Sequence, residues 1–472
     1  MPRTRVIPLI IAVALFMEQL DSTVIATSLP AIADDLGESP IALKLALTVY
    51  LLTLAVFIPI SGWTADRFGA KRIFRAAILV FTAGSIACAC AQSLEHFVFA
   101  RALQGLGGAM MTPVGRLVLL RSVEKHELVG ALAWLTVPAL LGPVLGPPVG
   151  GFITTFASWH WIFLINVPIG LIGWVLVTRF IPNHRVESPP PLDVLGFLYA
   201  GLGVGALAFG LSVAGLDLLP RSAVAGLIVG GGALCLLYLH HARRVANPIL
   251  DFDLLRLPTY YASVVGGFLF RIGIGSLPFL LPLMFQLGFG MTPFESGMLT
   301  FASALGALIM KASAAPILRR FGFRRVLAVN AVLSAGFLAT CSLFTPATPH
   351  ALILALLLIG GFFRSLQFTS INAIAYADIP PAQISRATSL SAVGQQLSLS
   401  AGVALGAFAL ETAFHARGGA AIAAQDFGPA FLVVAAVAAA STLVFARLAT
   451  DAGAVLATRP ELAAKPVKDS PA

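Results

Sequence analysis

The sequence is poor in charge. Aspartate, glutamate, lysine and arginine make up only 11% of its 472 residues, whereas 58% are hydrophobic. A soluble chain normally carries about 25% charged residues, because its surface faces water. So few charges cannot cover a soluble protein of this length, and the composition therefore excludes that class.

The residues that build catalytic and metal centres are few or scattered. The eight histidines are spread along the chain, so no cluster of nucleophile, base and metal ligands suggests an enzyme. The four cysteines fall in apolar segments, where a small soft hydrophobe is their ordinary role, and they imply neither a disulfide framework nor a metal site. No nucleotide-binding loop with its lysine is present, which argues against direct coupling to ATP. We expect a protein that is not an enzyme and uses no cofactor.

What the sequence has in abundance is apolar runs of about 20 residues, long enough to cross the hydrocarbon core of a membrane as helices. They predict an all-α polytopic membrane protein with short connections and no soluble domain. The fourteen spans that we predict lie near residues 8–33, 42–62, 73–92, 97–119, 127–153, 161–181, 193–214, 222–241, 260–287, 293–315, 325–345, 350–372, 386–412 and 427–449.

The basic residues support this arrangement. If both termini are cytoplasmic, 22 of the 30 lysines and arginines fall in cytoplasmic segments, 3 in outer segments and 5 within spans. The positive-inside rule requires such an asymmetry. Orientation and contact with anionic lipid thus account for the net charge of +9, and we expect no nucleic-acid partner.

The two halves of the chain look related. "GWTADRFGAKRIF" from Gly62 comes after the second span and "LRRFGFRRVL" from Leu318 comes after the tenth, and both place R-F-G with trailing basic residues between two helices. Duplicated halves mark many transporters. We therefore expect a six-helix bundle at 1–185, an inserted two-helix hairpin with a cytoplasmic linker at 186–250, a second six-helix bundle at 251–450 and a disordered cytoplasmic tail at 451–472.

Four ordered motifs carry a resemblance to a known family. The loop from Gly62 resembles motif A of the major facilitator superfamily, and "LDSTVIATSLPAIADDLG" from Leu20 resembles the first-helix motif of its fourteen-span drug/proton antiporters. "RALQGLGGAMM" from Arg101 resembles their motif B, "GPVLGPPVGG" from Gly142 resembles their antiporter motif C, and "SWHWIFLINVPIG" from Ser158 is similar to the segment after motif C in that group. The second half matches mainly by its span pattern. The resemblance implies two six-helix bundles plus two inserted spans, with the first and fourth helices of each bundle lining a central cavity.

Motif A also has a physical interpretation. A carboxylate that faces a neighbouring helix N-terminus can form a charge–dipole latch, and basic residues can bind anionic lipid or close the cytoplasmic side. The alternative is that these charges only set the orientation. The conformational-switch residues that we predict are Gly62, Asp66, Arg67, Gly69, Lys71 and Arg72.

In motif C, glycines recur at every fourth residue with prolines beside them. Such a stripe lets two helices pack backbone to backbone, and the prolines bend the helix. In the family this helix seals one half against the other, although the stripe alone would suit any helix bundle. The helix-packing residues that we predict are Gly142, Pro143, Gly146, Pro147, Gly150 and Gly151.

The fourth span carries a stripe of small residues with an arginine at each end. Arg101, Gly105, Gly108, Thr112 and Arg116 share one narrow face at 100° per residue. Because nothing bulky separates the arginines, the stripe predicts the wall of a cavity.

Two acids in the first span point to proton coupling. Glu18 and Asp21 share a face, and Asp21 lies at a depth similar to that of Arg101. A carboxylate beside an arginine inside a membrane is a natural proton switch, because the cation keeps it ionised until the cation is otherwise engaged. The alternative is a static ion pair. We predict Asp21, Glu18 and Arg101 as the proton-coupling residues.

Two further arginines lie near the middle of apolar spans. Arg271 lies within "GGFLFRIGIGSLPFLLPLMF" and Arg364 within "GGFFRSLQF", at comparable depth. Guanidinium groups bind carboxylate and phosphate oxygens, so the substrate is expected to be anionic, unless these arginines are structural. The polar "SLSAVGQQLSLSAG" could contact substrate or bond to neighbouring helices. The substrate-binding residues that we predict are Arg271, Arg364, Arg116, Gln395 and Gln396.

The function predicted from these features is proton-coupled export of small organic molecules by alternating access. The expected substrates are organic anions, metal chelates or acidic drugs, and the expected location is a bacterial inner membrane with both termini cytoplasmic. A broad exporter of lipophilic or cationic compounds and a transport-inactive sensor are the alternatives. The expected partners are the substrate, protons and the bilayer, and the sequence is silent on a periplasmic adaptor.

Overall fold

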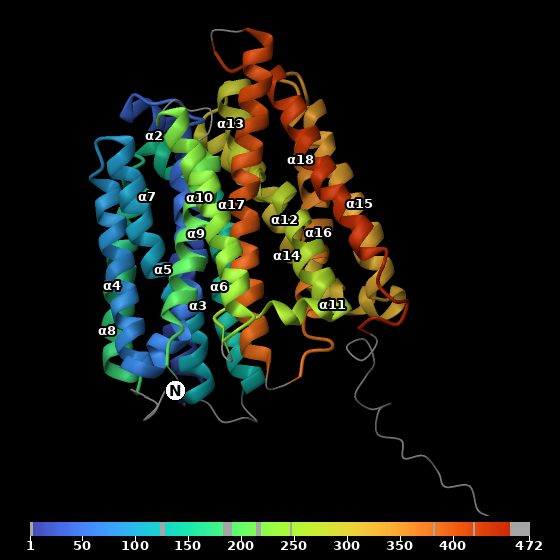
Figure 1. Cartoon of the computed structure of the whole chain (residues 1–472). Coiled ribbons are helices and arrows are strands. Elements are labelled where there is room, and N and C mark those ends of the chain that lie inside the picture. Colours follow the sequence, from blue (N-terminus) through green and yellow to red (C-terminus); the bar gives the residue numbers. More distant parts are fainter. Residues whose placement is uncertain are drawn as a thin grey trace, which may run out of the picture.

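The computed structural model describes residues 3–122, 128–182, 191–213, 219–245, 248–380, 383–418 and 421–453. Throughout these residues the regular structure is helical, and none of them forms a β-strand. The long helices run side by side, with the N terminus at one end of the assembly (Figure 1). We call this the N-terminal end.

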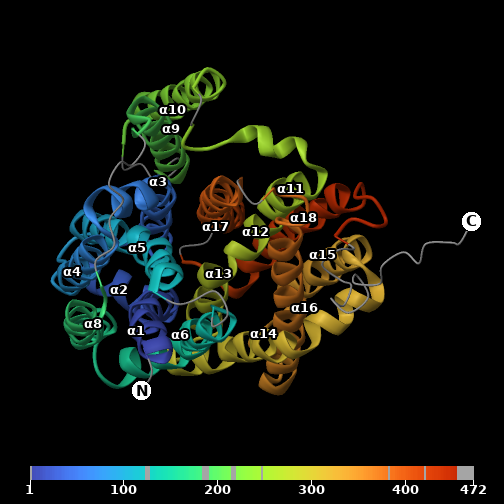
Figure 2. The same cartoon turned by 90° about the horizontal axis from the view of Figure 1, so that it is seen from below.

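The first half of the chain forms one group of helices, seen on one side when the molecule is viewed along the helices (Figure 2). Its members are α1 (Arg3–Val24), the 3-10 turn Ile25–Ser28, α2 (Leu29–Leu36), α3 (Lys44–Phe68), α4 (Ala70–Ala89), α5 (Leu94–Ser122), α6 (Leu128–Phe156), α7 (Trp161–Leu164) and α8 (Asn166–Phe180).

The second group begins after a 3-10 turn at Phe252–Arg256 and lies on the other side of the molecule (Figure 2). Its members are α11 (Pro258–Tyr261), the π-helix Ala262–Gly266, α12 (Gly267–Gly275), α13 (Leu277–Leu283), the π-helix Met284–Gly288, α14 (Pro293–Phe321), α15 (Phe323–Thr340), the 3-10 turn Cys341–Leu343, α16 (His350–Ile374), α17 (Ile384–Arg417) and α18 (Ala424–Phe445).

Helices α9 (Val194–Val213) and α10 (Arg221–Ala242) form a hairpin at the periphery. The hairpin packs on itself, and α9 also contacts α3 and α17, which belong to different groups (Figure 2). The two helices correspond to the inserted spans seven and eight, although the predicted domain boundaries themselves stay predictions.

Twelve segments of the described chain are long and apolar enough to cross a membrane. Helices α5 and α6, each of 29 residues, are not among them but occupy the places of the fourth and fifth predicted spans. The described part of α6 contributes only a shorter apolar helix, Val144–Phe156. The all-α polytopic class is thus confirmed, while the count of fourteen spans stays a prediction.

The repeated R-F-G segments adopt the same turn. A single glycine, Gly69, joins α3 to α4 with φ 98°, and Gly322 joins α14 to α15 with φ 73°. Its amide donates to the carbonyl four residues back in each case, Ala65 and Leu318. Residues with a side chain rarely adopt such positive φ angles, so glycine is required at both connectors. The local repeat seen in the sequence is therefore also a repeat in backbone geometry.

At the end opposite the N terminus, an ion pair joins α17 to α18. Arg417 at the end of α17 donates from Nε and Nη2 to the two carboxylate oxygens of Asp426 at 2.6 and 2.8 Å, and it also donates to the carbonyl of Ala421 at 2.5 Å. This bidentate pair holds the end of α17 against the first turn of α18. In Figure 1, α17 rises above the neighbouring helices at this end.

Candidate functional site

A buried polar network surrounds Asp21 in the first group of helices. Both Asp21 and Arg101 are 0% exposed, and Nη1 of Arg101 lies 2.8 Å from Oδ2 of Asp21. The other oxygen, Oδ1, accepts hydrogen bonds of 2.8 Å from the amides of Gln104 and Asn166. Three donors from α5 and α8 thus hold the carboxylate of α1, which is the geometry that a buried charge needs.

The network extends beyond the residues that the sequence analysis selected. Gln104 accepts from Arg101, and Ser85 of α4 accepts from both Gln104 at 2.7 Å and Asn166 at 3.2 Å. The guanidinium carbon of Arg101 also stacks 4.3 Å from the ring of Tyr50. Gln104 lies three residues after Arg101 and hence on the same helix face. This spacing is the feature of the sequence that could have indicated its place in the network.

Glu18 lies at the edge of this network. Its Oε2 accepts a hydrogen bond of 2.9 Å from Thr112, and it is 8% exposed. Arg116, one turn further along α5, is close enough to interact with Glu18 electrostatically. Asp21 and Arg101 are paired in the structure, as their similar depth in the sequence predicts. The proton-coupling role of these residues stays a prediction.

The glycine stripe of α5 is not a cavity wall, contrary to our expectation. A Cβ at Gly105 would lie 2.9 Å from the carbonyl of Tyr50, and one at Gly108 would lie 3.1 Å from Leu54. Both glycines therefore pack against α3. Close helix contact, rather than open space, is the reason for small residues on this face.

One end of the stripe does reach a cavity. Arg116, which is exposed, lines a cavity of about 230 Å³ together with Arg271 and residues of the π-helix, α16 and α17. The cavity lies toward the N-terminal end, and none of its twelve lining residues is acidic. Arg116 comes from the first group of helices and Arg271 from the second, so the two groups meet at this cavity.

Arg271 is buried without a carboxylate partner among the described residues. It is 5% exposed, and its Nη2 donates to the amide oxygen of Asn372 at 3.0 Å. Its guanidinium carbon lies 5.9 Å from the ring of Phe368. A Cβ at Gly267 would come within 2.7 Å of Nη1, so a larger residue there would require the guanidinium to shift.

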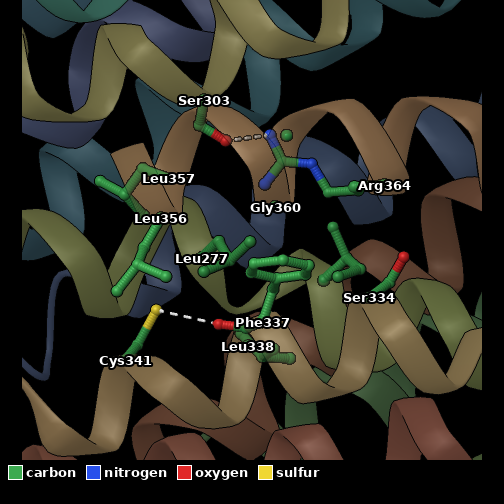
Figure 3. A pocket seen from close by; sticks show the side chains of 12 residues that line it. Leu277, Ser303, Ser334, Phe337, Leu338, Cys341, Leu356, Leu357, Gly360 and Arg364 are labelled. Atoms are coloured by element: carbon green, nitrogen blue, oxygen red, sulfur yellow. Dashed lines mark hydrogen bonds between the residues drawn. The ribbon is translucent and has the colours of Figure 1, made fainter. Parts of the chain in front are cut away.

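The other predicted substrate residues do not all line the same cavity. Gln395 lines the same cavity as Arg271, whereas Gln396 does not, and the Oε1 atom of Gln396 is buried without a hydrogen-bond partner. Arg364 points across a different, smaller pocket toward Ser303, to which it donates at 2.7 Å (Figure 3). Arg364 and Arg271 therefore line different pockets although they lie at similar depth, and their role in substrate binding stays a prediction.

The motif A residues lie in the last turns of α3 and the first turn of α4, at the N-terminal end of the molecule. Gly69 forms the connector, Asp66 and Lys71 are half-buried, and Gly62, Arg67 and Arg72 are exposed. A Cβ at Gly62 would meet nothing within 4 Å. The placement suits a switch, but its action stays a prediction.

The motif C glycines are used for close helix packing. A Cβ at Gly142, Gly146 or Gly150 would come within 2.8, 2.0 or 2.3 Å of α1 or the turn after it, at Gln19, Thr23 and Val24 respectively. Gly151 instead faces α14, where a Cβ would lie 2.4 Å from the carbonyl of Pro293. Pro147 contributes its carbonyl, 2.3 Å from the position of a Cβ at Gly297 of α14, while the side chain of Pro143 lies outside the described residues. Helix α6 thus touches the other group through backbone.

The two groups are joined at the end opposite the N terminus. Among the described residues, two hydrogen bonds link them: Gln286 donates to the carbonyl of Thr27 at 2.9 Å, and the amide of Phe294 donates to Thr155 at 3.0 Å. Phe294 also packs its ring against Phe156, with centroids 5.8 Å apart. The molecule is therefore closed at this end, while the cavity of Arg271 lies toward the other.

Comparisons with known proteins agree with this architecture. Residues 11–239 and 263–470 match the family model described as Major Facilitator Superfamily. The chain is 38% identical over 448 residues to the "Putative multidrug resistance protein MdtD" of Salmonella paratyphi A, and 39% identical over 448 residues to the protein of the same name from Klebsiella pneumoniae. Each alignment covers 94% of both chains.

Solved structures show the same fold at low identity. A D-xylose-proton symporter aligns with a TM-score of 0.69 at 14% identity, covering 95% of this chain and 98% of the other. A bacterial homologue of the human lysosomal transporter Spinster aligns with a TM-score of 0.66 at 15% identity, covering 97% and 99%. With the family match across both groups of helices, the chain belongs to the Major Facilitator Superfamily and is a multi-pass membrane transporter, not an enzyme.

Proposed function

We propose that this protein is a proton-coupled exporter that moves small organic anions out of the cytoplasm by alternating access. The name of its relatives, multidrug resistance protein, supports export. The observation that carries the substrate class is the cavity at Arg116 and Arg271, which holds two guanidinium groups and no acidic lining residue. An exporter of lipophilic cations would be expected to present carboxylates there.

The position of the cavity fits the loading step. With the N terminus in the cytoplasm of a bacterial cell, as the basic residues predict, the closed end of the molecule faces outward. A substrate would then enter from the cytoplasm and bridge the two groups through Arg116 and Arg271. Because each group supplies one arginine, a bound anion favours their rigid-body closure around it.

The cavity is small for a drug site. Its volume of about 230 Å³ is below the ~300–1,000 Å³ of typical ligand pockets. Small carboxylates or phosphates can be bound there by the planar guanidinium of Arg271, which lines the cavity. We therefore expect selectivity for compact anions.

Helices α1 and α5 connect the cavity to the proton residues. Arg101 and Arg116 lie 15 positions apart on α5, or about 22 Å along its axis. On α1, Asp21 precedes Thr27, the acceptor of the link to Gln286, by six residues. Protonation of Asp21 would release Arg101 and loosen α1 next to the outer closure, so that proton entry favours the outward-open state. The proton gradient is the energy source, and no cofactor is required.

The experiment is proton release from acid-loaded inside-out vesicles that contain the full-length protein. A panel of organic anions and a panel of lipophilic cations are added to wild type, Arg271→Ala and the control Arg256→Ala. Arg256 pairs with Asp253 on the surface, where its side chain is 84% exposed, so its loss leaves the cavity intact.

Release by anions that is lost in Arg271→Ala and kept in Arg256→Ala supports the proposal. Release by cations that persists in Arg271→Ala refutes the anionic substrate and indicates an ordinary multidrug exporter. No release by either panel, with the protein folded and inserted, refutes transport coupled to protons.

A further inference from the structure

Arg101 and Arg364 occupy corresponding places in the two halves. Each begins the pattern R-x-L-Q, at 101–104 on α5 and at 364–367 on α16, and each of these helices occupies the place of the fourth predicted span of its bundle. Tyr50 and Ser303 each lie 19 residues before the connector glycines, Gly69 and Gly322. Arg101 stacks on Tyr50 and Arg364 donates to Ser303, so the correspondence holds in the contacts as well as in the sequence.

The two arginines differ in what neutralises them. Arg101 pairs with Asp21 at 2.8 Å. Arg364 makes its one hydrogen bond within the described chain to Ser303, and no described carboxylate forms an ion pair with it. Arg364 is half-buried, and the part of an unpaired guanidinium that is removed from water is not compensated by an opposite charge.

A small pocket lies beside the guanidinium of Arg364 (Figure 3). Its volume is about 20 Å³, room for one water-sized species and too little for an organic substrate. Ser334 lines it as well, is 3% exposed, and has an Oγ without a hydrogen-bond partner. The thiol of Cys341 is directed instead to the carbonyl of Phe337, at 3.7 Å (Figure 3).

The polar side chains that line this pocket can act as donors. The guanidinium has five N–H groups and no acceptor, and the hydroxyls of Ser303 and Ser334 can each donate. No acidic residue is among the twelve that line the pocket, the rest of which are apolar or glycine apart from Cys341. A water molecule could occupy the space but would leave the positive charge uncompensated, whereas a monatomic anion would satisfy both the donors and the charge.

We propose that this pocket binds a single chloride ion between Arg364, Ser303 and Ser334. The ion supplies to Arg364 the negative charge that Asp21 supplies to Arg101. This site is separate from the cavity of Arg271, and it does not depend on the transported substrate. Its expected effect is to stabilise the packing of α14, α15 and α16, the helices that supply its polar groups.

The test is thermal unfolding of the purified full-length protein in detergent, with sodium chloride replaced stepwise by sodium gluconate at constant ionic strength. Chloride should raise the Tm of wild type by about 2 °C or more, in a saturating manner. Arg364→Gln should lose this response. Arg271→Gln, which removes the unpaired guanidinium of the larger cavity, should keep it.

A second variant covers the case in which Arg364→Gln does not fold. Ser303→Asp places a carboxylate beside Arg364, so it should raise the Tm in gluconate and abolish the response to chloride. Absence of any chloride response in wild type would overturn the proposal. So would a chloride response of wild-type size in either Arg364→Gln or Ser303→Asp, because the ion would then bind elsewhere.

Discussion

Replacing Gly151 with alanine should weaken the closure between the two groups of helices. The added Cβ would lie 2.4 Å from the carbonyl oxygen of Pro293 and 2.9 Å from the Cα of Phe294. Real Cβ atoms essentially never approach heavy atoms closer than 3.0 Å, so α6 and α14 must separate locally by about 0.6 Å, the difference between 3.0 and 2.4 Å. Both obstructing atoms are backbone and cannot rotate away.

The steric clash in Gly151→Ala would destabilise only the conformation in which the two groups are closed at this end. Overpacking of this kind typically costs about 1–3 kcal/mol. Because the contact exists between the groups, the cost is removed when they part at this end, and the equilibrium between closed and open states should shift by roughly 5- to 150-fold toward opening. Gly297→Ala meets the carbonyl of Pro147 at 2.3 Å and should act in the same direction.

Hydrogen–deuterium exchange of the full-length protein in lipid discs measures this shift. Peptides covering Ile25–Leu36 and Met284–Ser296, which hold the closure contacts, should exchange faster in Gly151→Ala. Gly205→Ala is the matched control, because a Cβ there meets nothing within 4 Å while the gain in helix propensity of about 1 kcal/mol is the same. Exchange at the wild-type rate in Gly151→Ala would refute the assignment of this contact to the closure.

Three further outcomes are expected from the contacts described above. Asp21→Asn should abolish proton-coupled efflux in vesicles while the protein stays folded, and unchanged coupling would show that Asp21 is not the switch. Asn166→Ala removes a hydrogen bond to a charged group, worth about 1.5–3 kcal/mol, and should lower the thermal unfolding temperature, with a null result indicating that water replaces the amide. Gly322→Ala, at φ 73° with nothing within 4 Å of a Cβ, should cost about 1–2 kcal/mol through backbone strain alone; Gly336→Ala, which is helical and equally unobstructed, should not lower the unfolding temperature.

The sequence predicted the features that depend on spacing along one helix. The apolar spans, the glycine stripe of α6 and the shared depth of Asp21 and Arg101 are all consequences of 1.5 Å per residue and 100° per residue. The connector glycines could also be located, because the R-F-G pattern occurs twice.

The sequence could not provide the rotation of each helix about its axis relative to its neighbours. Arg271 and Arg364 lie at similar depth, yet one lines the larger cavity and the other a pocket within the second group. The face of α5 with Gly105 reads equally well as a cavity wall or a packing surface, since small residues serve both. Gln104 and Asn166 were missed because an amide in a span indicates only that some partner exists.

The length of α17 has a practical consequence. Its 34 residues extend about 51 Å, more than the ~40–45 Å thickness of a bilayer with its headgroups. The end that stands clear of the lipid is braced by Arg417 against Asp426. The paired helix ends offer a membrane-proximal epitope, and an antibody fragment raised against them would give a small transporter the asymmetric mass that particle alignment in electron cryomicroscopy requires.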